Sequence, residues 1–133
     1  MSYNQAFQAY QQNSVATASP GELTLQLYNG CLKFIKLGRE AMENKEIKAK
    51  NENLQKAQNI ITEFMLTLNP DYEISGQLMP LYDYINYLLR QANINDDVAQ
   101  LDEADQMVRE LRDTWKEVIK LDRQNKYASG AQA

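Results

Sequence analysis

The side chains that most often carry out catalysis are scarce in this chain of 133 residues. It contains no histidine and a single cysteine, Cys31. Without histidine there is no imidazole base, no Ser-His or Cys-His nucleophile pair, and no Glu-x-x-His motif of the kind that holds two irons in ferritin-like bundles. Cys31 has no base partner in the sequence and lies among apolar residues. We therefore expect an inert, buried thiol in a reducing compartment.

Charged side chains could supply two other chemistries. The acidic residues near the start of the last predicted helix are Asp96, Asp97, Asp102 and Glu103. They favour the positive end of that helix, and we expect them to face water. The arginines that could line a pocket for a dicarboxylate are Arg39, Arg90, Arg109 and Arg112. Most of them fall off the apolar stripes of their helices, so we predict no enzyme activity, no cofactor and no metal site.

The composition is that of one soluble globular domain. Hydrophobic residues make up 44% of the chain, charged residues 24%, and the net charge is −4. Lysine and arginine are scattered among acidic residues in the sequence, without a basic stripe, so we do not expect nucleic-acid binding. There is neither a cleavable signal at the N-terminus nor an apolar run near the ~20 residues that cross a membrane. These features predict a cytoplasmic protein without membrane insertion.

An apolar period of 3.6 residues recurs in four blocks, and no alternation typical of strands is sustained. The blocks cover about 20–43, 46–68, 74–94 and 97–121. Ser19, Pro20 and Glu22 form a capping box at the first block, and Asp96 is the predicted cap of the fourth. Short links favour an all-α, antiparallel up-down four-helix bundle over residues 19–122. A mobile arm with aromatic anchors, residues 1–18, precedes it, and a flexible tail, residues 123–133, follows it.

The third block contains Pro80, which removes one backbone hydrogen bond and crowds the carbonyl of Gly76. The helix therefore either kinks at Pro80 or begins next to it, and the pattern does not decide between the two. The residues of its predicted core face are Ile74, Leu78, Leu81, Ile85, Leu88, Leu89 and Ala92.

The first block carries more apolar surface than a bundle needs. Its apolar residues cover an arc of roughly 240°, whereas a surface helix usually buries a stripe of little more than ~100°. Gly30 and Gly38 lie on this arc and predict a close approach of a neighbouring backbone. Tyr84 and Tyr87 point away from the third stripe, and Ile60 lies off the second. These features predict an apolar groove that binds an amphipathic segment of a partner. The alternative is that the surplus apolar face closes a homodimer.

The sequence also resembles the flagellin export chaperones called FliS. The matching segments are residues 10–15 (Tyr-Gln-Gln-Asn-Ser-Val), 17–25 (Thr-Ala-Ser-Pro-Gly-Glu-Leu-Thr-Leu), 27–30 (Leu-Tyr-Asn-Gly), 81–84 (Leu-Tyr-Asp-Tyr) and Ala92-Asn93. The similarity covers nearly the whole chain and suggests a Bacillus-like source. It departs from the expected pattern at Met79-Pro80, where a good helix former is expected.

The resemblance implies a cytoplasmic chaperone that binds the disordered C-terminal segment of flagellin, prevents premature polymerisation and delivers flagellin to the type III export gate, whose cytoplasmic domain is the second expected partner. It also implies that the arm bearing Tyr10 covers part of the groove when flagellin is absent. A weak homodimer is a further possible partner state of the protein without flagellin. The residues expected to contact flagellin or the arm are Tyr10, Leu23, Leu27, Tyr28, Ile60, Tyr84 and Tyr87.

Overall fold

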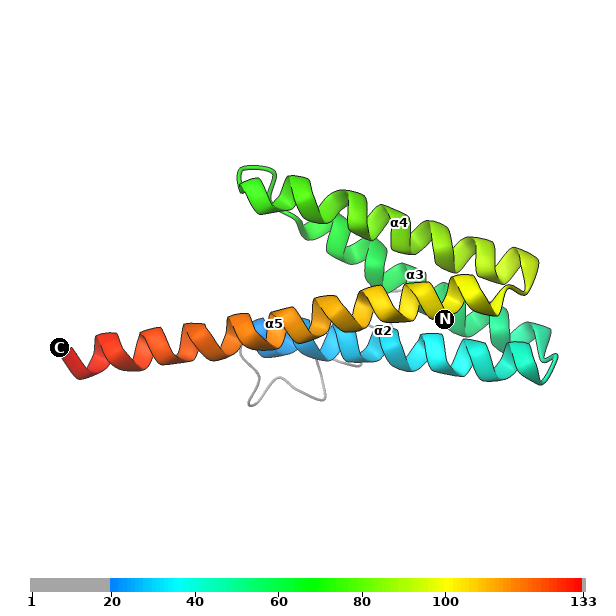
Figure 1. Ribbon diagram of the computed structural model, residues 1–133, viewed down its shortest axis with the longest axis horizontal. Coiled ribbons are helices and arrows are strands. Elements are labelled where there is room, and N and C mark those ends of the chain that lie inside the picture. Colours follow the sequence, from blue (N-terminus) through cyan, green and yellow to red (C-terminus); the bar gives the residue numbers. More distant parts are fainter. Residues whose placement is uncertain (1–19, 133) are drawn as a thin grey trace.

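The computed structural model describes the backbone of residues 20–132 and the side chains of residues 21–125. Four helices fill this part of the chain: α2 (Pro20–Glu43), α3 (Ile47–Thr67), α4 (Glu73–Asn95) and α5 (Val98–Gln132). They run alternately up and down (Figure 1), and each packs against two neighbours, in the order α3, α2, α5, α4 and back to α3. The predicted all-α, antiparallel four-helix bundle is confirmed. The arm, residues 1–18 with Tyr10, and the capping residue Ser19 lie outside the described residues.

One hydrophobic core joins all four helices. Its largest fully buried side chains are Cys31 and Ile35 of α2, Leu54, Ile60 and Ile61 of α3, Ile85, Leu88 and Leu89 of α4, and Leu101 and Val108 of α5. Gly38 of α2 faces Leu54 of α3 so closely that a Cβ atom at this position would lie 2.5 Å from Leu54 Cδ2. The close approach predicted at Gly38 is therefore present, but a leucine side chain makes it rather than a neighbouring backbone.

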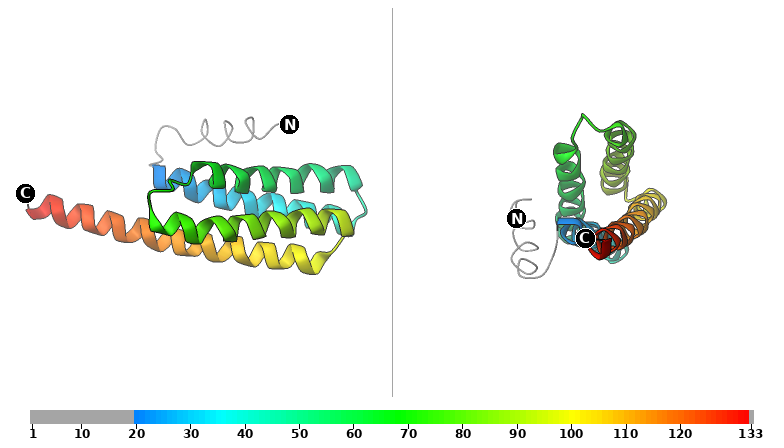
Figure 2. Two further views of the ribbon diagram at one scale, coloured as in Figure 1. Left: turned by 90° about the horizontal axis from the view of Figure 1, so that it is seen from above. Right: turned by 90° about the vertical axis from the view of Figure 1, so that its left-hand side faces the viewer.

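Two of the turns reverse the chain through a non-glycine residue with positive φ. At the end of α2, Lys45 has φ 58°, and the amides of Lys45 and Glu46 donate to the carbonyls of Met42 and Ala41. This is the Schellman arrangement, which satisfies the last carbonyls of a helix. Asp96 has φ 50° at the corresponding position after α4, and the Asp97 amide donates to Ala92. Both turns lie at the same end of the bundle (Figure 2).

The predicted cap of the fourth helix was off by one residue. Asp97 Oδ1 accepts the amides of Ala99 at 3.0 Å and Gln100 at 3.3 Å, so Asp97 is the cap of α5. Asp96 instead forms an ion pair with the buried Lys50, 2.6 Å from Nζ to Oδ1. The two adjacent aspartates have the same capping propensity, and only the backbone conformation at residue 96 separates their roles.

The structure also shows where α4 begins and where α5 ends. α4 begins at Glu73 and continues through Pro80. Gly76 and Pro80 are both exposed, so water can reach the Gly76 carbonyl that loses its backbone donor. α5 continues through Gln132, past the predicted end near Leu121, and extends beyond the rest of the bundle (Figures 1 and 2). Residues 122–128 contain neither proline nor glycine, so nothing in them ends a helix.

Candidate functional site

An apolar groove lies between α4 and α5. Its cavity of about 220 Å³ is lined by Leu81 of α4 and by Met107, Glu110, Leu111 and Thr114 of α5. Leu81 is 40% exposed, and Met107 and Leu111 are half-buried. We call this feature the α4–α5 groove. Because its walls are apolar and open to solvent, it can bind an apolar side chain of another segment.

Exposed apolar side chains extend the groove along α4. Tyr84 and Tyr87 are 40% and 45% exposed, and their rings stack with centroids 6.2 Å apart. The Tyr84 hydroxyl donates to Glu103 Oε1 of α5 at 2.9 Å, and this hydrogen bond raises the pKa of Tyr84. In the other direction along α4, Ile74 is 54% exposed. The helix thus presents four apolar residues, Ile74, Leu81, Tyr84 and Tyr87, next to a groove that can hold a partner's side chains.

The position of α4 explains why part of its predicted core face is exposed. At the α4–α5 turn the two helices are close together, and towards the start of α4 they move apart (Figure 1). Ile85, Leu88, Leu89 and Ala92 are buried near the turn, whereas Ile74 and Leu81 are exposed and Leu78 is half-buried. The first half of the predicted stripe is therefore only partly covered, because Leu78 packs against the core while Ile74 and Leu81 stay exposed.

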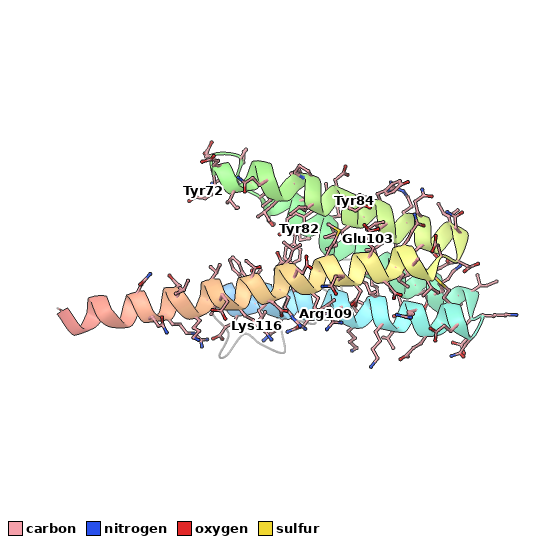
Figure 3. The ribbon with its side chains drawn as sticks, in the orientation of Figure 1. Tyr72, Tyr82, Tyr84, Glu103, Arg109 and Lys116 are labelled. Carbon is pink, nitrogen blue, oxygen red and sulfur yellow. The ribbon has the colours of Figure 1, made fainter. Side chains whose placement is uncertain are left out.

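Three stacked aromatic rings connect α2, α3 and α4 inside the bundle. Phe64 of α3 stacks on Tyr28 of α2 at 4.6 Å and on Tyr82 of α4 at 5.6 Å between centroids. The hydroxyls of Tyr28 and Tyr82 lie 2.6 Å apart and form a buried hydrogen bond. Burial raises the pKa of both hydroxyls, so both stay protonated. Figure 3 shows Tyr82 between α4 and α5, with Tyr84 and Glu103 further towards the turn.

The predicted contact residues divide into buried and accessible sets. Leu27, Tyr28 and Ile60 are 6%, 4% and 1% exposed and belong to the core cluster, and their contact with flagellin or the arm stays a prediction. The wide apolar arc of α2 has a structural reason, since both α3 and α5 pack against that helix. Leu23 is half-buried, and Tyr84 and Tyr87 are accessible. Tyr10 lies outside the described residues.

The sequence analysis did not single out Ile74, Leu81, Met107 or Leu111 as site residues. Ile74 and Leu81 were assigned to the core because periodicity identifies an apolar face but not whether a neighbour covers it. Pro80 was the only local sign of something unusual in this part of α4.

The groups considered for catalysis have structural partners. Cys31 is fully buried, its thiol lies 3.7 Å from the Ala57 carbonyl, and burial raises its pKa. Such a thiol is unreactive. Asp102 pairs with Arg39, and Glu103 accepts the Tyr84 hydroxyl. Within the described residues, no three side chains of His, Cys, Asp or Glu gather as a metal site would require.

Comparison with known proteins identifies the family. Residues 3–122 match the family described as "Flagellar protein FliS". The chain belongs to the FliS family. It is 51% identical over 130 residues to the flagellar secretion chaperone FliS of Bacillus subtilis, with 98% of each chain covered. It is 31% identical over 110 residues to the same chaperone of Salmonella typhimurium, covering 80% of this chain and 82% of that one.

A solved structure supports the same assignment. A bacterial flagellar chaperone superposes with a TM-score of 0.71 at 27% sequence identity, covering 87% of this chain and 96% of the other. Family membership places the chain among the flagellar secretion chaperones and in flagellum biogenesis. In the described part, none of the helices has the length and apolar character needed to cross a membrane.

Proposed function

We propose that the chain is a cytoplasmic chaperone that binds the disordered C-terminal segment of flagellin along α4 and the α4–α5 groove, keeps it from polymerising and delivers it to the flagellar type III export gate. The observation that carries the proposal is the row of exposed apolar residues on α4, Ile74, Leu81, Tyr84 and Tyr87, beside a solvent-accessible groove. An exposed row of this kind suits an amphipathic segment that has no folded core of its own. The assignment to a family of flagellar secretion chaperones supports a role in flagellar secretion.

The energetics favour an apolar surface of this extent. Ordering a disordered segment costs roughly 2–5 kcal/mol or more, which only extensive burial of apolar area can offset. Tyrosine also suits such a surface, because its ring packs on a partner while its hydroxyl stays hydrogen-bonded. Tyr84 already has this arrangement through Glu103.

Isothermal titration with a peptide of the flagellin C-terminal segment tests the proposal. We expect Leu81→Ala and Tyr84→Ala to weaken binding by about 10-fold each, since central apolar anchors of an interface commonly contribute 1–2 kcal/mol or more. Leu66→Ala is the matched control, because Leu66 is 75% exposed on α3 and does not line the groove. Equal losses for Leu66→Ala and Leu81→Ala, or no loss for Leu81→Ala, would place the binding site elsewhere.

Two measurements address the arm and the homodimer. If residues 1–18 cover the groove, removing them while keeping Ser19 increases the association rate with the flagellin peptide, and slower association shows that they belong to the binding site.

Light scattering of the free protein tests for the homodimer. A dimer that persists on dilution and on addition of the peptide would argue for self-association as the role of the apolar surface.

A further inference from the structure

Opposite the apolar row of α4, the outer seam between α2 and α5 gathers basic side chains. A cavity of about 350 Å³ lies in this seam. Its basic lining residues are Lys33, Lys36, Arg39, Arg109 and Arg112. Only two acidic residues, Asp102 and Asp105, line it as well, both at the end near the α4–α5 turn.

A second cavity, of about 400 Å³, continues the seam towards the start of α2. Lys116, Lys120 and Arg123 line it, with Glu22 as its acidic member. The five basic residues of the first cavity and these three form what we call the basic seam. It holds eight of the chain's 14 lysines and arginines against three acidic lining residues, although the chain as a whole has a net charge of −4.

The spacing on α5 gives the seam its length. Basic residues occur at 109, 112, 116, 120 and 123, so each follows the last by three or four residues and all lie on one face of the helix. They span about 21 Å at 1.5 Å per residue. Figure 3 shows Arg109 and Lys116 on the side of α5 away from Tyr72, Tyr82 and Tyr84. The expectation that the sequence has no basic stripe is therefore wrong for α5, which carries one on a single helix face, and packing of α2 adds Lys33, Lys36 and Arg39 to it.

Half of the basic residues of the seam have no ion pair with another described side chain. Arg39, Arg109, Arg112 and Arg123 pair with Asp102, Asp105, Asp113 and Glu22, respectively. Lys33, Lys36, Lys116 and Lys120 are exposed and form no ion pair within residues 21–125. Between the charges the lining is partly apolar, with Leu25 and Ile119 half-buried and Leu32 8% exposed, beside the polar Asn29 and Gln124.

We propose that the basic seam docks an acidic amphipathic helix of a protein partner. A helix laid along the seam would place its apolar side chains over Leu25 and Ile119, while carboxylates spaced three or four residues apart would reach the unpaired lysines. A nucleic acid suits the seam less well, because Asp102 and Asp105 would repel phosphates at one end and the apolar lining would stay uncovered. The seam and the α4–α5 groove use different faces of α5, so both can be occupied at once.

A labelled synthetic peptide provides the test. The probe is a helical peptide of about 20 residues with glutamate at every third or fourth position and leucine on the adjoining stripe. The same peptide with glutamine in place of glutamate is its control. Fluorescence anisotropy with the full-length protein should show binding of the acidic peptide that weakens several-fold between about 50 and about 150 mM NaCl. The glutamine peptide should bind at least about 10-fold more weakly.

Charge-reversal variants locate the binding site. Lys33→Glu with Lys116→Glu should weaken peptide binding at least about 10-fold. Lys48→Glu with Arg90→Glu changes the net charge by the same amount on α3 and α4, away from the seam, and should change binding less than about 2-fold. All four residues are exposed, so both double variants keep the fold. Tyr84→Ala should leave peptide binding unchanged.

Three outcomes would overturn the proposal. The first is an equal effect of the two double variants on peptide binding, which would show that the peptide responds to the net charge of the protein and not to the seam. The second is loss of peptide binding in Tyr84→Ala, which would move the peptide to the α4–α5 groove. The third is tighter binding of a short single-stranded RNA or of anionic lipid vesicles than of the acidic peptide, with the same sensitivity to Lys33→Glu and Lys116→Glu. That result would assign the seam to a nucleic acid or a membrane surface.

Discussion

Gly38 and Gly76 are both helical glycines, and their surroundings give them opposite roles. A Cβ atom at Gly38 would lie 2.5 Å and 2.8 Å from two atoms of Leu54, which is fully buried. At Gly76 a Cβ atom would meet nothing within 4 Å. The absence of a side chain is thus required for packing at Gly38, whereas at Gly76 it only adds backbone freedom to the unfolded chain.

Alanine substitutions at the two glycines should change stability in opposite directions. We expect Gly38→Ala to lower the free energy of unfolding by about 1–3 kcal/mol, because Leu54 has little space into which it can move. Gly76→Ala should raise it by about 0.5–1 kcal/mol, since alanine is the better helix former. Urea unfolding followed by circular dichroism measures both. A stabilised Gly38→Ala variant would mean that α3 shifts freely against α2.

The hydroxyls of Tyr28 and Tyr82 are each other's hydrogen-bond partners, 2.6 Å apart inside the bundle. Both residues are also packed on Phe64, so a change to phenylalanine keeps the ring contacts and removes only a hydroxyl. Removing one hydroxyl leaves the other buried without this partner, which costs about 1–3 kcal/mol.

The two single variants and the double variant form a thermodynamic cycle. Tyr28→Phe and Tyr82→Phe should each destabilise the protein by about 1–2 kcal/mol, and the double variant should cost less than the sum of the two. Chemical denaturation of the four proteins gives the coupling energy. Strict additivity would show that water, and not the partner tyrosine, satisfies each hydroxyl.

At the scale of the elements, one ion pair connects α3 to the turn between α4 and α5. Lys50, in the first turn of α3, is 6% exposed, and its ammonium donates to the Asn93 carbonyl at 3.0 Å and to Asp96 Oδ1 at 2.6 Å. Asp96 is the αL residue that ends α4. The interaction fixes the end of the bundle at which all the helices stay close together.

Removing the carboxylate alone should be worse than removing both charges. Asp96→Asn keeps a residue that tolerates αL, and we expect it to cost about 1–2 kcal/mol because Lys50 loses its counter-charge. Adding Lys50→Met should recover part of the loss, since a buried apolar side chain needs no partner. Thermal unfolding monitored for both variants checks the order. If the double variant were the less stable, the lysine's bond to Asn93 would be the dominant contribution.

The sequence predicted the helices better than the surfaces between them. The start of α2 at Pro20 and the order of the helices followed from capping residues and a period of 3.6. The burial of Ile60 and Leu81 did not follow from the pattern. Ile60 lies off its predicted apolar stripe and is buried, whereas Leu81 lies on its stripe and is exposed. Burial depends on how α4 diverges from its neighbours, and this angle is set by packing of the whole bundle rather than by either helix alone.

At the scale of the whole molecule, α5 separates two kinds of surface. One side of it forms the α4–α5 groove with Leu81, and the other forms the basic seam with α2. The groove suits apolar contacts with a segment that must be released later, and the seam suits electrostatic contacts that depend on salt. Neither surface is visible in the composition, because the bundle sorts apolar and basic residues onto different faces only when it folds.

Buried protonated groups make the stability of the whole molecule sensitive to alkaline pH. Cys31, Tyr28 and Tyr82 come from two helices of one core, and burial raises the pKa of each above its ordinary value of 9.0 or 10.0. Between those values and the higher pKa values of the folded state, the unfolded chain has lost protons that the folded chain retains. The free energy of unfolding therefore decreases as the pH rises above about 9, by up to about 1.4 kcal/mol per pH unit for each proton.

Thermal unfolding between about pH 7 and about pH 11 at constant ionic strength tests this dependence. We expect these groups to leave the melting temperature unchanged below about pH 8.5 and to lower it steadily above about pH 9.5. The variant with both Tyr28→Phe and Tyr82→Phe has two fewer protons to release on unfolding, so its melting temperature should fall less steeply with pH even though it starts lower. Tyr87→Phe is the control, because Tyr87 is 45% exposed on the surface of α4 and lies outside the buried pair. If the doubly substituted protein loses stability with pH as steeply as the wild type, the alkaline transition arises from surface charge repulsion and not from the buried hydroxyls.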